Sequence, residues 1–143
     1  CALPILAELS YKTSNHIKEY VEKSIEDFNL KKILNLKGRQ LSGGQRRKVE
    51  IARTLVADPK IILLDEPFAG IDPIAVEDIQ SILVNLKNSN IKVLITDHNV
   101  REALDICDES FVISEGKIIA NGSKENLIND ELVKKVYLGK MYN

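Results

Sequence analysis

Two short segments rich in aliphatic residues, 61–64 and 91–96, constrain the fold of this chain more than any other feature of its sequence. The continuous aliphatic run of residues 61–64 is typical of a β-strand that is covered on both faces, and residues 91–96 are predicted to form another buried strand. Between the two runs, Asp72-Pro73 predicts a helix start, because an N-cap residue is followed by proline at the first helical position. This helix is predicted to end near Lys87-Asn88. The residues expected on its buried face are Val76, Ile79, Ile82 and Leu83.

A further helix and a further strand are predicted at residues 100–106 and 110–114. The alternation of strands and helices predicts an α/β fold, with a mainly parallel sheet flanked by helices and right-handed crossovers. The turn Glu115-Gly116 predicts a hairpin between strand 110–114 and a strand at 117–120. Short helices are expected near residues 124–128 and 131–137.

The part of the chain before residue 61 is predicted to be mainly helical. Val21, Ile25 and Phe28 are spaced as one face of an amphipathic helix, and Gly38 is expected to end a helical segment. A second helix is predicted over residues 43–56, since Pro59 follows its end. The residues expected on its buried face are Val49, Ala52, Leu55 and Val56.

Composition excludes several classes of protein. The 143 residues have the length of about one domain, and a net charge of −1 from 20 basic and 21 acidic residues gives no support for nucleic-acid binding. Cys1 and Cys107 are too few and too far apart for a disulfide framework, which favours a reducing compartment. No apolar run approaches the roughly 20 residues that span a bilayer. Any membrane role is therefore expected to come through a partner.

The carboxyl ends of the two aliphatic runs carry the candidate catalytic groups. Asp65 and Glu66 follow the first run and His98 follows the second, at the edge where parallel sheets bind ligands. Phosphoryl transfer to water needs a divalent metal and a group that orients the water. Asp65 is predicted to hold Mg²⁺ through water, Glu66 to act as general base and His98 to reach a γ-phosphate. The alternatives are an acidic turn before Pro67 and an ordinary surface histidine.

The segment Leu41-Ser42-Gly43-Gly44-Gln45 has two explanations. Ser42 and Gln45 have the spacing of a capping box, which requires no ligand. The capping box does not explain Gly43 and Gly44, because glycine weakens a first helical turn. They would let another backbone or a phosphate approach a helix N-terminus, which is an anion site. The basic run of residues 46–48 is interpreted as a solvated helix face.

The sequence contains no G-x-x-x-x-G-K-[ST] loop, which cradles the phosphates in nucleotide-hydrolysing sites. The spacing from Gly38 to Gly43 fits such a loop, but Gly44-Gln45 replaces the required Lys-Ser/Thr. The chain is therefore expected to be a fragment that carries half of an ATP site, and to be inactive alone.

Together these motifs resemble the ATPase subunits of ABC transporters. In that family LSGGQ is the signature motif, Asp65 ends the Walker B strand and Glu66 is the catalytic glutamate. Residues 69–72 resemble the D-loop, with Asp72 at its end, and His98 resembles the switch histidine. The resemblance implies the C-terminal part of a P-loop NTPase domain. Residues 1–40 would be the remainder of its helical subdomain and residues 41–143 part of the nucleotide-binding core.

The resemblance also implies cofactors and partners. ATP and Mg²⁺ would be bound between two subunits of a homodimer, to which this chain would contribute in trans. The contributing residues would be Ser42, Gly43, Gly44 and Gln45. Transmembrane permease subunits would be further partners, with no nucleic acid and no direct contact with the transported substrate. The location would be cytoplasmic, peripheral on the cytoplasmic face of the inner membrane.

Within the family, residues 46–53, 66–73, 95–102 and 133–139 most resemble the ATPases of lipopolysaccharide export. The ATPases of branched-chain amino-acid importers are the nearest alternative. Two other hypotheses stay open. One is an ABC ATPase without a transporter, acting on DNA or ribosomes, and the other is a non-catalytic remnant. Tandem cassettes or coiled-coil insertions are typical of the former, and the sequence shows neither.

Overall fold

The computed structural model describes residues 14–138. The chain divides into two compact units, Cys1–Thr96 and Asp97–Asn143. The boundary predicted at residue 40 lies inside the first unit and stays a prediction. Among the described residues, no helix is long and apolar enough to cross a bilayer.

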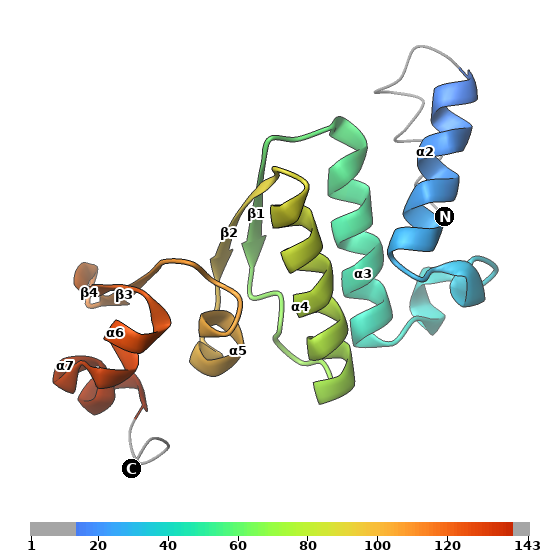
Figure 1. Cartoon of the computed structure of the whole chain (residues 1–143). Coiled ribbons are helices and arrows are strands. Elements are labelled where there is room, and N and C mark those ends of the chain that lie inside the picture. Colours follow the sequence, from blue (N-terminus) through green and yellow to red (C-terminus); the bar gives the residue numbers. More distant parts are fainter. Residues whose placement is uncertain (1–13, 139–143) are drawn as a thin grey trace. The chain divides into compact units, whose positions relative to one another are not determined.

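The first unit is built around a β–α–β element (Figure 1). Strands β1 (Ile61–Asp65) and β2 (Lys92–Thr96) run parallel, with Ile61 opposite Lys92 and Asp65 opposite Thr96. The connecting helix α4 (Pro73–Asn88) packs against β2. The remaining elements are α2 (Ser14–Asp27), α3 (Gly43–Thr54) and the short 3₁₀ turns Lys31–Ile33, Gly38–Gln40 and Leu55–Ala57. The predicted parallel pairing is confirmed.

The start of α4 follows directly from the sequence. Asp72 is the N-cap and accepts a hydrogen bond from the backbone N–H of Ala75 at 3.0 Å, while Pro73 occupies the first turn. Proline fits there because its missing N–H would have no helical partner. The predicted buried face is confirmed for Ile79, Ile82 and Leu83.

The prediction that both strands are covered on both faces is wrong for the described residues. Ile62 and Leu64 are buried, whereas Leu63 between them is 71% exposed. Successive strand side chains point to opposite faces. One face of the two-stranded sheet is thus covered, and on the other Ile61, Leu63 and Leu94 stay exposed.

Two helix boundaries also differ from the prediction. Helix α3 ends at Thr54 and continues as the 3₁₀ turn Leu55–Ala57, which ends at Asp58, a residue in the left-handed conformation. Gly38 begins a 3₁₀ turn instead of ending a helix. Ile51, which was not expected in the core, is fully buried.

The second unit has its own small core. It contains α5 (Val100–Leu104), the antiparallel hairpin β3 (Ser110–Ser114) and β4 (Lys117–Gly122), α6 (Lys124–Asn129), α7 (Glu131–Val133) and a π-helical turn (Lys134–Leu138). Glu115 and Gly116 both have positive φ, as the tight two-residue hairpin turn requires. The predicted hairpin is confirmed. The core of the second unit consists of Leu104, Leu127 and Val133.

Helices α3 and α4 lie side by side (Figure 1), and Gly44 of α3 lies against Ala75 of α4. A β-carbon built on Gly44 would stand less than 3.0 Å from the Cβ of Ala75 on α4. Real side chains do not tolerate that distance, so the glycine is required for helices packed this tightly. The first turn of α3 is thus fixed by its neighbour in the same unit.

We expect Gly44→Ala to lower the free energy of unfolding by about 1–3 kcal/mol, as overpacking typically does. Ala75→Gly in the same chain should restore part of that loss, because it removes the atom that the new methyl group meets. Gly38→Ala is the matched control, since nothing lies within 4 Å of its added Cβ. Urea unfolding measures all three variants. Equal losses for Gly44→Ala and Gly38→Ala would show that the helix contact is not limiting.

Candidate functional site

Asp65 stands at the last position of β1, opposite Thr96 at the end of β2. The Thr96 hydroxyl donates a hydrogen bond to Asp65 Oδ1, which orients the carboxylate. Asp65 is exposed at this end of the sheet. The described residues contain no cluster of three or more acidic, histidine or cysteine side chains suited to a metal. A single exposed carboxylate fits Mg²⁺, which is usually held by one or two carboxylates plus water and phosphate oxygens.

Glu66 follows with an unusual backbone conformation. Its φ is +47°, a region that non-glycine residues rarely adopt and that costs about 1–3 kcal/mol. Three hydrogen bonds hold this conformation. The Glu66 N–H donates to the carbonyl of Thr96 at 2.7 Å, and the Glu66 carbonyl accepts from the N–H of Ala69 at 3.2 Å and from Arg47 Nη2 at 3.1 Å. The exposed side chain is therefore directed by a fixed backbone.

His98 belongs to the second compact unit, so its predicted place at the same sheet edge as Asp65 and Glu66 stays a prediction. The His98 side chain is 65% exposed, and its Nδ1 lies 3.9 Å from Asp97 Oδ1. The side chain of Asp97 is fully buried, and the same oxygen accepts a hydrogen bond from the N–H of Asn99 at 2.8 Å. This short turn fixes the backbone from which His98 projects.

The capping box predicted at the start of α3 is confirmed. The N–H of Gln45 donates to Ser42 Oγ at 3.2 Å, and the N–H of Ser42 donates to Gln45 Oε1 at 3.0 Å. Gly43 lies close to another backbone segment. A β-carbon there would be 3.2 Å from both the carbonyl oxygen of Gly70 and a methyl of Ile71. Packing inside the unit thus explains both glycines, while Ser42 and Gly43 remain exposed.

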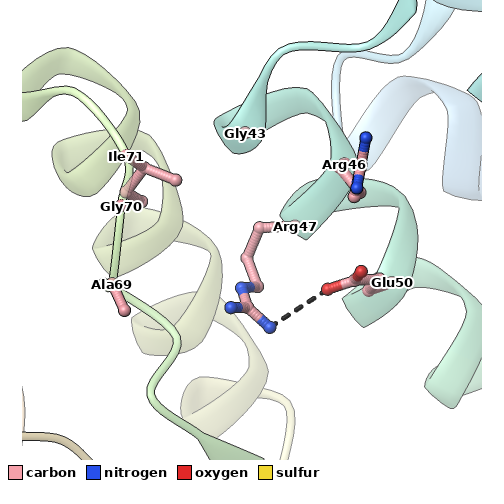
Figure 2. A pocket seen from close by; sticks show the side chains of 7 residues that line it. All are labelled: Gly43, Arg46, Arg47, Glu50, Ala69, Gly70 and Ile71. Atoms are coloured by element: carbon pink, nitrogen blue, oxygen red, sulfur yellow. Dashed lines mark hydrogen bonds and ion pairs between the residues drawn. The ribbon is translucent and has the colours of Figure 1, made fainter. Parts of the chain in front are cut away.

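A pocket of roughly 330 Å³ opens between the first turns of α3 and the segment that precedes α4. Its lining residues are Gly43, Arg46, Arg47, Glu50, Ala69, Gly70 and Ile71. Figure 2 shows the side chains of Arg47 and Glu50, both from α3, paired on one side of the pocket. Asp72 follows this segment, and its carboxylate caps α4 by accepting a hydrogen bond from the N–H of Ala75. Any further part that it plays at an ATP site stays a prediction.

The interpretation of residues 46–48 as a solvated face is correct only for Arg46, which is exposed. The Arg47 side chain is 27% exposed and reaches the carbonyl of Glu66, whereas Lys48 is 14% exposed and pairs with Asp78 on α4. Sequence reasoning missed the contact of Arg47 with Glu66. The two residues are far apart in the sequence, and no spacing rule links them.

The family model for ABC transporters matches residues 5–69. A lipopolysaccharide export ATP-binding protein, LptB, from Haemophilus influenzae is 54% identical over 130 residues, which are 91% of this chain and 54% of the relative. LptB from Escherichia coli K12 is 53% identical over 116 residues, or 81% of this chain and 48% of the relative.

The chain is similar to the ATP-binding subunits of ABC transporters. It spans about half the length of the curated relatives that it matches.

Solved structures show the same fold. An ATP-binding cassette of an ABC transporter in its ADP conformation is 34% identical, with a TM-score of 0.78 over 91% of this chain and 52% of that one. The protein cbiO1 from Clostridium perfringens, part of an ABC transporter complex, is 30% identical. Its TM-score is 0.81 over 97% of this chain and 56% of that chain. The predicted fold class, an α/β segment of an ABC ATPase, is confirmed.

We expect Ser42→Ala to lower the free energy of unfolding by about 0.5–2 kcal/mol, because it removes the acceptor for the Gln45 N–H. Ser42→Asn is the matched control, since asparagine caps a helix about as well as serine. Thermal unfolding followed by circular dichroism compares the two. A Ser42→Ala chain as stable as Ser42→Asn would show that the capping box contributes nothing.

Proposed function

We propose that these residues form part of an ATP-binding and ATP-hydrolysing site that powers an ABC transporter. The observation that carries the proposal is the carboxyl end of β1. There an exposed Asp65 is oriented by Thr96, and the next residue, Glu66, is fixed in a strained conformation by hydrogen bonds from both sides. Strain of this kind clusters at functional sites.

The chemistry follows from the order of these two carboxylates. Asp65 would hold Mg²⁺ through water, and the bound ion would neutralise phosphate charge. Glu66 would accept a proton from the water that attacks the γ-phosphate, as a general base positioned by its backbone. His98 would contact the γ-phosphate. The phosphate loop that completes such a site would lie N-terminal to these residues in a whole cassette.

Two copies would act together, each offering the start of its α3 to the ATP held by the other. Ser42 and Gly43 are exposed at a helix N-terminus, where backbone N–H groups attract anions. Gly44 would act indirectly, by allowing the close packing that holds this turn in place. Gln45 would do the same through the capping box.

We further propose that the transported substrate is lipopolysaccharide. The support comes from the LptB proteins of two bacteria, which are 53–54% identical to this chain over the aligned residues. The chain would then sit at the cytoplasmic face of the inner membrane against permease subunits. It would pass the energy of ATP hydrolysis to them without touching the lipid.

In a cassette that carries a phosphate loop N-terminal to these residues, we expect Glu66→Gln to lower ATP turnover by about 10²–10⁴ while leaving ATP binding intact. The amide has the same shape but cannot take up a proton. Steady-state phosphate release measures turnover, and size-exclusion chromatography with Mg-ATP should show a trapped dimer. A variant that turns over like the parent would remove Glu66 from the role of general base.

We expect Ser42→Asp to block hydrolysis at the site completed by the partner's phosphate loop. Aspartate still caps α3, so the helix is kept, but its charge repels the γ-phosphate. Ser42→Asn, which caps equally and is neutral, should hydrolyse faster than Ser42→Asp. Gly44→Asp would be uninformative here, because the new side chain meets Ala75.

The measurement uses a heterodimer of one Ser42→Asp subunit and one intact subunit, with the phosphate-loop lysine removed from either in turn. Activity should be lost at the intact subunit's own phosphate loop. Loss at the phosphate loop of the subunit that carries Ser42→Asp would contradict the trans arrangement and leave capping as the role of Ser42.

A further inference from the structure

We propose that Arg47 is a positioning residue that holds the backbone of Glu66 in the conformation needed for catalysis. The inference rests on the proposed ATPase function and extends it to a residue on a different element. Arg47 lies on α3, directly after the capped turn, whereas Glu66 follows β1. The contact therefore ties the helix that would face the partner's ATP to the glutamate that would activate water.

The guanidinium of Arg47 bonds to two acceptors at once. Nη2 donates to the carbonyl oxygen of Glu66 at 3.1 Å, and Nη1 donates to Glu50 Oε2 at 3.0 Å. A planar guanidinium presents several N–H groups in fixed directions, so holding one of them at Glu50 aims another at Glu66. Figure 2 shows the Arg47 side chain extending from α3 toward the segment of Ala69 and Gly70, with Glu50 of the same helix as its ion-pair partner.

The backbone of Glu66 is strained and must be held in place by its neighbours. Its φ of +47° is unfavourable for a residue with a side chain, and the conformation persists because neighbouring groups hold it. On the amino side the Thr96 carbonyl holds the N–H of Glu66. On the carboxyl side the carbonyl is held by the N–H of Ala69 and by Arg47. Removing Arg47 takes away the shorter of these two bonds, at 3.1 Å, and leaves the longer bond from Ala69, at 3.2 Å.

A purely structural role for Arg47 predicts a different outcome. The ion pair between Arg47 and Glu50 joins partly exposed residues on one helix, and pairs of this kind contribute little to stability. A structural role would lower the melting temperature and leave the turnover of the folded protein unchanged. A positioning role would lower kcat, because misplacing a catalytic group by about 1 Å can cost up to about 100-fold in rate.

The test measures Arg47→Gln in a cassette that carries a phosphate loop N-terminal to these residues. We expect kcat to fall by about 10- to 100-fold and the KM for ATP to stay within about twofold of the parent. Arg53→Gln is the matched control, because Arg53 is exposed on the same helix, and it should leave kcat unchanged. If Arg47→Gln does not fold, Arg47→Lys replaces it. A single ammonium cannot reproduce the two-armed contact, so kcat should fall there too.

The double variant Arg47→Gln with Glu66→Gln separates positioning from other effects. If Arg47 acts through Glu66, removing it from a chain that lacks the carboxylate should not lower the residual rate further. A further fall comparable to that in the parent would overturn the inference. So would a folded Arg47→Gln or Arg47→Lys variant with kcat within about twofold of the parent.

The same measurements show which idea has failed. If Glu66→Gln abolishes turnover and Arg47→Gln does not change it, the proposed function stands and the positioning role is wrong. If Glu66→Gln turns over like the parent, the proposed function fails, and the role of Arg47 fails with it.

Discussion

The parallel pairing of β1 with β2 is the constraint on which the candidate site depends. It places Asp65 opposite Thr96, so that a threonine hydroxyl can orient the carboxylate. The pairing also extends one residue beyond β1, since the N–H of Glu66 donates to the Thr96 carbonyl. A register shift of one residue would turn every side chain of the strand to the opposite face and separate these groups.

Much of this arrangement could be predicted from local sequence signals. Asp72-Pro73 identified the start of α4, Ser42 and Gln45 the capping box, and Glu115-Gly116 the hairpin turn. Each signal is reliable because the hydrogen bonds or backbone angles that it requires involve only a few adjacent residues. The position of Asp65 at a strand end followed from the aliphatic run before it.

Other features could not be predicted, because they depend on residues that meet only after folding. An aliphatic run does not reveal which layer covers each face of a strand, and Leu63 proved to be exposed. The basic residues after Gln45 gave no sign that Arg47 bonds to Glu66 and Lys48 to Asp78. The two glycines of the motif fitted a phosphate and a backbone equally well. The structure supplies the backbone and Ala75 as their neighbours.

The contact between Gly44 and Ala75 also restricts how sequences of this kind can vary. At this crossing the two helices leave room for one β-carbon, and Ala75 supplies it. A lineage that gains a side chain at position 44 must give up the one at position 75, or else separate α3 from α4. The residue allowed at position 44 thus depends on the residue at position 75, although the two are thirty-one positions apart in the sequence.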